Sequence, residues 1–255
     1  MRSDERWQTV PRRVRRGYAV LLNDDGYEAL GLLCKVGDVL IATDSVLGID
    51  AIYVPEENRT GYGGLLRNSV DIPYRIAKTP LRPEPVYIVE GYPAEIPYLH
   101  RRLAQENHWN AAVQFISVNR GWNVGTQIFN SGTVMSVVQA TWIGYSGLAV
   151  SFPPKLKKIR PMDMDMIAWC ARRLHRGQVW SLNLPEEYCR PFTKPALCRL
   201  GAVKYHTIVS LNRNSTFTIK DRDAEFLSGD AKYCRAGWPT LVNLTDLVEG
   251  TIQRD

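Results

Sequence analysis

The chain has 255 residues, of which 45% are hydrophobic and 23% charged, and its formal net charge is +6 at pH 7. This composition is ordinary for a soluble globular protein, and the length suffices for one large α/β domain or two small ones. Apolar runs such as "WIGYSGLAV" are far too short to cross a bilayer, which excludes a membrane-spanning protein.

The N-terminal segment, residues 1–16, carries six arginines against two acids. It has no apolar centre, so it does not resemble a secretory signal, and Asp4 and Glu5 argue against a targeting presequence. We expect a flexible basic arm at 1–16, followed by a single domain at 17–255. A nucleic-acid contact through the arm is the less favoured alternative.

The five cysteines form no C-x-x-C pair, and the four histidines form no H-x-x-x-H or H-E-x-x-H spacing. Widely spaced cysteines of odd number favour reduced thiols in a cytoplasmic protein over a disulfide framework or a zinc site.

The first part of the chain alternates between strand and helix patterns. An apolar run at Tyr18–Leu22 predicts a strand, and the segment 27–50 predicts a helix followed by a strand. A further strand is expected at Ala51–Val54. Four prolines between Asp71 and Pro85 predict edge strands or an excursion from the sheet. The stretch "VYIVEG" predicts a strand, and "AEIPYLHRRLAQENHW" a helix with Pro97 in its first turn.

The centre of the chain shows the clearest pattern. "AAVQFISVN" predicts a strand, "RGWNVGTQIFNSG" a loop, "TVMSVVQATWIGY" a helix that ends near Gly144, and "GLAVSF" another strand. This succession predicts a βαβ unit in a parallel sheet. A helix at "MDMDMIAWCARRLHRG" and a strand at "QVWSLNLP" follow, and the segments from Ala196 to Leu244 predict an antiparallel appendage. The expected fold class is therefore α/β: a Rossmann-like, mostly parallel sheet with helices on both faces and an antiparallel C-terminal extension.

Two adjacent carboxylates, Asp24 and Asp25, follow the first predicted strand. A solvated turn would explain them, because Asn, Asp and Gly are common turn formers. In open α/β sheets, however, ligands bind at the carboxyl ends of the strands. That geometry would bring the acidic turn together with the loop at Asn58–Gly61 and the loop at Asn119–Thr133.

The polar groups of these three loops suit two kinds of ligand. Carboxylates, hydroxyls and amides are hard oxygen donors, which suit Mg²⁺, Mn²⁺ or Ca²⁺, and a bound dication would let both aspartates stay ionised. The step Ser131-Gly132-Thr133 opens a helix, where free N–H groups favour an anion such as phosphate. Together these sites match the needs of metal-assisted phosphate-ester hydrolysis.

In order and combination, these motifs resemble the SurE family of metal-dependent 5′/3′-nucleotidases. The N-D-D-G turn is matched from Asn23 to Gly26, and the R-S-G loop by Arg59-Thr60-Gly61. The asparagine- and glycine-rich segment is matched by Asn119, Gly121, Asn123 and Gly125. "NSGTV", "GYSGLAVS", "SLNLPEE" and the closing "SGDAKYCRAGWPTLVNLTDL" continue the likeness, which spans Tyr18 to Leu247.

The resemblance implies one divalent metal ion per subunit, Mg²⁺ or Mn²⁺, and a nucleoside monophosphate substrate that is cleaved to nucleoside and phosphate. It also implies a homodimer or tetramer built through the C-terminal segment. The implied metal ligands are Asp24, Asp25, Thr60 and Asn119, with Asp24 and Asp25 also catalytic. The implied phosphate-binding residues are Asn23, Asn123, Ser131, Gly132 and Thr133.

Several residues depart from the family pattern. Thr60 replaces a serine, Ser117 replaces a glycine ahead of Asn119, and Asn130 replaces a tyrosine. These departures leave a second hypothesis open: a catalytically impaired protein of the same fold that binds nucleotide or phosphate. Trp122, Tyr62 and Tyr92 are candidates for stacking on a base, but packing would explain them equally well.

Overall fold

The structure is a computed structural model that describes residues 17–109, 113–211 and 217–246. The strands are β1 (Tyr18–Leu22), β2 (Gly48–Pro55), β3 (Tyr74–Ala77), β4 (Val86–Val89), β5 (Val113–Arg120), β6 (Ser146–Phe152), β7 (Val179–Asn183), β8 (Ala196–Leu197), β9 (Val203–Leu211), β10 (Phe217–Phe226) and β11 (Thr240–Asn243). The α-helices are α1 (Leu30–Ala42), α2 (Ile96–Asn107), α3 (Gly132–Trp142), α4 (Pro161–Ala171) and α5 (Gly229–Arg235). Short 3₁₀ helices are η2 (Tyr27–Ala29), η3 (Pro93–Glu95) and η4 (Gly125–Asn130).

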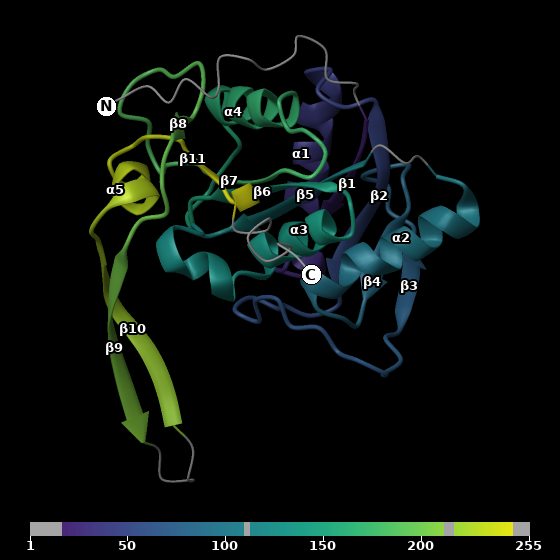
Figure 1. The fold of residues 1–255 in the computed structure, drawn as a ribbon, viewed down its shortest axis with the longest axis horizontal. Coiled ribbons are helices and arrows are strands. Elements are labelled where there is room, and N and C mark those ends of the chain that lie inside the picture. The colour runs from purple at the N-terminus through teal and green to yellow at the C-terminus, as the bar shows by residue number, and fades with distance from the viewer. Residues whose placement is uncertain (1–16, 110–112, 212–216, 247–255) are drawn as a thin grey trace.

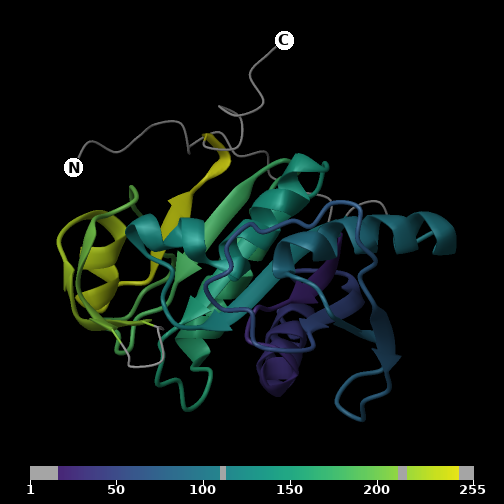
Figure 2. The same ribbon diagram turned by 90° about the horizontal axis from the view of Figure 1, so that it is seen from below.

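One mixed sheet of nine strands runs in the order β3-β4-β2-β1-β5-β6-β7-β11-β8. The six neighbouring strands β4, β2, β1, β5, β6 and β7 pair in parallel. Strand β3 runs antiparallel to its neighbour β4, and β11 runs antiparallel to its neighbour β7. Helices α1 and α4 cover one face, and α2 and α3 cover the other (Figure 1); the view from below shows the same packing (Figure 2). The expected α/β class with helices on both faces is confirmed.

Burial of both sheet faces follows from the apolar strands. In β1, Ala19 and Leu21 point into the core beneath α1 and α4, whereas Val20 and Leu22 point into the core beneath α2 and α3. Because successive side chains of a strand point to opposite faces, a strand covered on both sides must be apolar throughout. Polar residues can therefore follow the central strand only beyond its carboxyl end, at the rim of the sheet.

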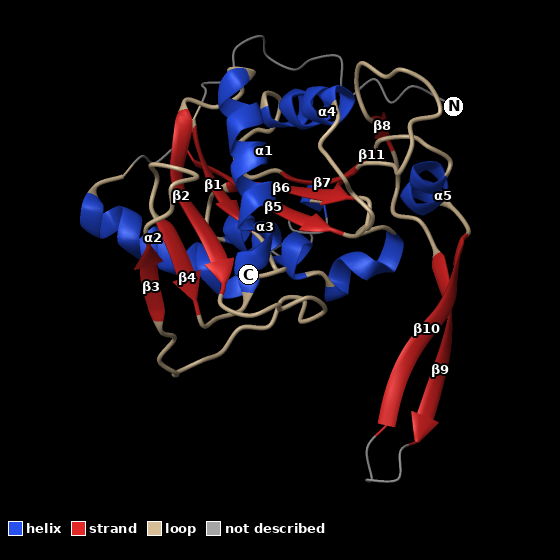
Figure 3. Ribbon diagram, turned by 180° about the vertical axis from the view of Figure 1, so that it is seen from behind, coloured by secondary structure: helices blue, strands red, loops and turns tan. Residues whose placement is uncertain are grey.

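Most predicted elements occur where expected. The proline-rich stretch contains the edge strand β3, Pro97 lies in the first turn of α2, and Gly144 follows α3 with φ of 95°. The segments predicted around residues 48–54 form one strand, β2, rather than two. The C-terminal appendage was predicted correctly only for the hairpin β9–β10, which projects from the body (Figures 1 and 3). Strands β8 and β11 instead join the main sheet.

Other expectations concern thiols, membranes and the N-terminal arm. All five cysteines are free thiols. Within the described ranges, no helix has the length and apolar character that a bilayer crossing requires. The predicted basic arm at 1–16 lies outside the described residues.

Candidate active site at the carboxyl edge of the sheet

The acidic turn lies directly after β1 and is enclosed by the loop that follows β2. Asp24 is 1% exposed. Gly26 turns the chain with φ of 89°, and a Cβ there would lie 3.2 Å from the backbone of Glu57, so only glycine fits this close approach. The backbone N–H of Arg59 donates to the Asp24 carbonyl at 2.7 Å. The two loops are thereby joined side by side at one edge of the sheet.

Asp24 faces the N-terminus of α3. The hydroxyl of Thr133 donates to Asp24 Oδ1 at 2.6 Å, and the Thr133 N–H donates to Oδ2 at 3.2 Å. A Cβ on Gly132 would lie only 2.9 Å from Asp24 Cβ, so this close contact also requires glycine. Burial raises the pKa of Asp24 to about 6, the Thr133 hydroxyl opposes that rise, and the charge of Asp25 adds to it.

Asp25 connects two further loops. Its Oδ2 accepts from the backbone N–H of Arg120 at 3.1 Å, and its Oδ1 lies 3.5 Å from the Thr60 hydroxyl, at the outer limit for a hydrogen bond. The Thr60 N–H donates to Asn58 Oδ1 at 2.8 Å, and this bond shapes the loop that presents the Thr60 hydroxyl. Burial raises the pKa of Asp25 above its usual value, and the hydrogen bond from the Arg120 N–H opposes only part of that rise. Three of the four predicted metal ligands thus meet, and the fourth, Asn119, directly precedes Arg120.

Asn119 is held by its neighbours at the ends of β5, β6 and β7. The Asn123 side-chain amide donates to Asn119 Oδ1 at 3.2 Å and to Ser151 Oγ at 2.9 Å. The Asn123 backbone exchanges hydrogen bonds of 2.8 and 3.1 Å with the Asn183 side chain. Asn123 is predicted from the sequence to bind phosphate. In the structure, its side-chain donors bond to Asn119 and Ser151, so Asn123 positions Asn119.

The remaining phosphate candidates differ in what they offer. Ser131 is the N-cap of α3: its Oγ accepts from the Val134 N–H at 3.1 Å, which leaves the hydroxyl hydrogen available to a ligand. Thr133 directs both of its donors at Asp24. Asn23 donates to the Gly26 carbonyl at 3.0 Å, and its buried Oδ1 has no hydrogen-bond partner among the described residues.

The arrangement suits a divalent cation. Within the described part of the chain, neither Asp24 nor Asp25 forms an ion pair, although burial disfavours two adjacent carboxylates without a cation. The Asn23 Oδ1 atom is a further buried oxygen without a donor. Among the described residues, no group of three or more His, Cys, Asp or Glu side chains could hold a metal ion, so the ligands at this edge would have to include hydroxyl and amide oxygens beside the two carboxylates. A carboxylate pair with hydroxyl and amide oxygens therefore fits a hard cation such as Mg²⁺ or Mn²⁺ better than a soft one.

Ser117, which stands where the family pattern has a glycine, is accommodated in this geometry. Strands β1 and β5 pair without a register shift from Tyr18 opposite Val113 to Leu22 opposite Ser117. Ser117 is fully buried, and its Oγ has no partner among the described residues. The altered residue is thus accommodated within the strand, and Arg120, three residues further on, still meets Asp25.

Sequence reasoning missed the neighbourhood of Arg59. Its guanidinium carbon lies 5.2 Å from the Tyr92 ring centre and 5.9 Å from that of Tyr62, and the two rings are 5.1 Å apart. The buried Arg59 Nε has no partner among the described residues. The R-T-G motif placed Arg59 in the correct loop, but no local signal shows that it packs against a tyrosine more than 30 residues away. Ser151 and Asn183, which hold Asn123, were also missed as site residues.

A Rossmann-like sheet with a carboxylate pair after its central strand, facing the N-terminus of a helix, is the arrangement in which open α/β proteins bind ligands at the carboxyl ends of their strands. The chain belongs to the SurE family: residues 19–207 match the family described as "Survival protein SurE".

Individual relatives agree with this assignment. The chain is 30% identical over 158 residues to the "5'-nucleotidase SurE" of Nitrosococcus oceani, an alignment that covers 60% of this chain and 54% of that protein. It is 24% identical over 241 residues to the "5'-nucleotidase SurE" of Clostridium beijerinckii, covering 88% and 91%. The crystal structure of the SurE protein from Aquifex aeolicus superimposes with a TM-score of 0.66 at 20% identity, covering 92% and 96%, and supports the fold.

Proposed function

We propose that the protein is a divalent-metal-dependent phosphomonoesterase that hydrolyses nucleoside 5′-monophosphates, and 3′-monophosphates as well, to nucleoside and phosphate. The proposal rests chiefly on one observation: buried Asp24, next to the half-buried Asp25, lies against the first turn of α3 through the two Thr133 contacts. A cation site and an anion site are thus adjacent at one edge of the sheet. The names of the two nucleotidase relatives support the substrate class.

In this proposal Asp24, Asp25, Thr60 and Asn119 hold one Mg²⁺ or Mn²⁺ ion. When bound, the ion supplies charge neutralisation of phosphate and activation of water. Asn123 and Ser151 keep Asn119 in place. The Ser131 hydroxyl donates to the phosphate oxygens at the helix N-terminus, and Asn23 lies beside the same edge. One of the two aspartates also accepts the proton from the attacking water.

The projecting hairpin β9–β10 is the segment through which we propose that subunits associate as a dimer or tetramer. Its two strands pair with each other and not with the main sheet. Removing residues 203–226 and measuring the molar mass by sedimentation tests this: a shift to monomer is expected, and an unchanged oligomer would refute it. Unpaired cysteines favour a reducing compartment, so we place the protein in the cytoplasm.

The enzymatic proposal is tested by phosphate release from AMP and from p-nitrophenyl phosphate, with Mg²⁺, with Mn²⁺ and with EDTA. Wild type should release phosphate only with a metal ion, and Asp24→Asn and Asp25→Asn should each lose at least a hundredfold in rate. The variant Glu106→Gln removes an exposed carboxylate of α2 and serves as the control. Retained activity in both Asn variants would exclude the acidic pair as a catalytic metal site. Binding of AMP without phosphate release would favour the nucleotide-binding alternative raised by Ser117 and Asn130.

A further inference from the structure

A cavity of about 430 Å³ opens among the loop after β5, the loop after β7 and the end of α5. Trp122, Glu186, Glu187, Tyr188, Arg235 and Gly237 are among the residues that line it. Its volume lies in the range of small-molecule sites and suffices for a purine ring. We call it the Trp122 pocket.

The pocket is joined to the proposed metal site through adjacent residues. Trp122 directly precedes Asn123, which positions Asn119. The Trp122 indole N–H donates to the Leu184 carbonyl at 2.7 Å, and the Asn123 N–H donates to Asn183 at 2.8 Å. With the bond from the Asn183 side chain to the Asn123 carbonyl, three hydrogen bonds attach this loop to the end of β7, so the indole is held in one orientation next to the site.

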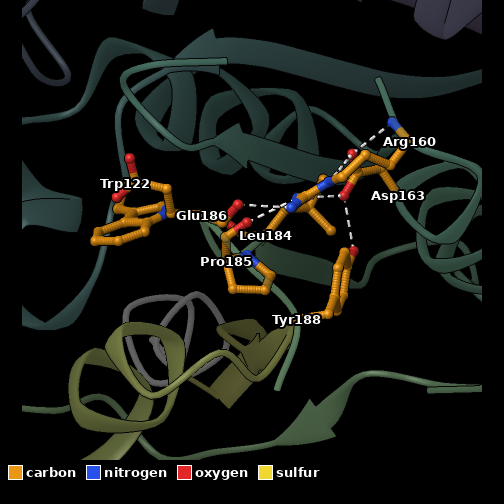
Figure 4. A network of polar contacts seen from close by, with 7 residues as sticks. All are labelled: Trp122, Arg160, Asp163, Leu184, Pro185, Glu186 and Tyr188. Carbon is orange, nitrogen blue, oxygen red and sulfur yellow. Dashed lines mark hydrogen bonds and ion pairs between the residues drawn. The ribbon is translucent and has the colours of Figure 1, made fainter. Parts of the chain in front are cut away.

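The segment after β7, which carries Glu186 and Glu187, is held in place as well. Arg160 donates to the carbonyls of Pro185 and Glu186, each at 2.7 Å, and pairs with Asp163 at 2.8 Å (Figure 4). Asp163 is fully buried and also accepts from the Tyr188 hydroxyl at 2.7 Å. This network fixes the backbone of the segment that carries Glu186 and Glu187. A preorganised wall loses little conformational entropy when a ligand binds.

The side chains of the pocket specify the chemistry of the ligand. Glu186 and Glu187 are exposed, and neither has an ion-pair partner among the described residues. Ionised carboxylates only accept hydrogen bonds, so they need a ligand with donor groups. Trp122 adds an aromatic surface, and Arg235, whose guanidinium carbon lies 5.9 Å from the Phe226 ring centre, adds donors. A flat ring that carries an amino group, together with an acceptor atom, satisfies all three.

We infer that the Trp122 pocket is the nucleobase subsite and that its carboxylates select bases with an exocyclic amino group, such as adenine, over oxo analogues such as hypoxanthine. The inference rests on the proposed function and adds the base preference of the same site. The base stacks on Trp122, an exocyclic amino group donates to Glu186 or Glu187, and Arg235 donates to a ring acceptor.

The test compares kcat/KM for AMP and IMP, with p-nitrophenyl phosphate as a substrate without a base. Wild type should prefer AMP to IMP by about tenfold, the size expected for a hydrogen bond to a charged group. The double variant Glu186→Gln with Glu187→Gln should bring that ratio close to one, whereas the control Glu106→Gln should retain it. Equal use of AMP and IMP by wild type, or an unchanged ratio in the double variant, would overturn the inference.

A second variant separates stacking from amino-group recognition. Trp122→Leu should lower kcat/KM for AMP and for IMP by about tenfold relative to that for p-nitrophenyl phosphate, because base stacking on an aromatic ring contributes roughly 1–3 kcal/mol. The AMP to IMP ratio should stay as in wild type. A Trp122→Leu protein that is folded by circular dichroism and handles all three substrates with wild-type ratios would contradict stacking at Trp122.

Failure of the proposed function would be distinguishable from failure of the pocket. If no substrate releases phosphate with either metal, the enzymatic proposal is wrong, but calorimetric binding of adenosine and inosine still tests the pocket. Tighter binding of adenosine than of inosine, lost in the glutamine double variant, supports it. Equal binding of the two nucleosides, or no binding of either, refutes it.

Discussion

The Thr133 hydroxyl donates a 2.6 Å hydrogen bond to Asp24, which lies 109 residues earlier in the chain. This contact joins the end of the first strand to the first turn of α3. It places the acidic pair and the N-terminus of a helix within one site, so a ligand with a bound cation and an anionic group could contact both.

Replacing Thr133 with valine keeps the shape of the side chain and removes its hydroxyl donor. Because that hydrogen bond lowers the pKa of Asp24, the pKa should rise further above about 6. The acid limb of the rate against pH should therefore move to higher pH, and the free energy of unfolding should fall by about 1–2 kcal/mol. Thr141→Val is the control, since that hydroxyl bonds to Val137 within the same helix. A shift of equal size in the control would argue against the Asp24 contact.

Gly132 and Gly31 form a matched pair of helical glycines. An alanine Cβ at Gly132 would lie 2.9 Å from Asp24 Cβ and 3.0 Å from Pro93, whereas at Gly31 it meets nothing within 4 Å. We expect Gly132→Ala to lower stability by about 1–3 kcal/mol and to reduce activity strongly, because Asp24 must move. Gly31→Ala should raise stability by roughly 0.5–1 kcal/mol and leave activity intact. Urea unfolding and steady-state rates of both variants measure this, and similar behaviour of the two would refute the steric argument.

Buried His100 makes stability depend on pH. It is fully buried among aromatic rings, its Nδ1 lies 3.2 Å from the Tyr53 hydroxyl, and burial lowers its pKa from 6.5 to about 4. Above pH 6.5 both the folded and unfolded states are neutral at this residue. As the pH falls from 6.5 to 4, only the unfolded state gains the proton, so up to about 3 kcal/mol of stability is lost.

The variant His100→Gln lacks this titration. Between pH 7 and pH 4.5 its free energy of unfolding should therefore fall by about 2–3 kcal/mol less than that of wild type. Urea unfolding at both pH values provides the comparison. Parallel losses in the two proteins would show that His100 is protonated in the folded state.

The acidic pair should make stability depend on metal ions. In EDTA, burial of the Asp24 carboxylate raises its pKa from 3.8 to about 6, so the folded state is penalised progressively as the pH rises through this interval. At pH 7.5 Asp24→Asn should therefore be more stable than wild type by up to about 3 kcal/mol, and below pH 3.8 the difference should vanish. Adding Mn²⁺ should raise the Tm of wild type and not that of the variant. Equal stabilisation of both proteins by Mn²⁺ would place the ion elsewhere.

Local patterns identified most of the fold. The apolar run at Tyr18–Leu22 predicts β1, and the proline-rich stretch predicts the edge position of β3, because both properties act within a few residues. Strand β11 was assigned wrongly to the appendage. Its pattern predicts a strand, but pairing with β7 depends on the chain returning to the main sheet after the hairpin.

The sequence by itself determined the family, the acidic turn after the central strand and the serine that caps α3, since these depend on residue order and local backbone propensities. Only the tertiary structure decided that Thr133 uses its donors on Asp24, that Asn123 holds Asn119, and that Trp122 and Arg235 line one pocket. Such contacts join residues far apart in the chain. They depend on how helices and loops pack over a common core, and a local pattern of residues carries no record of that packing.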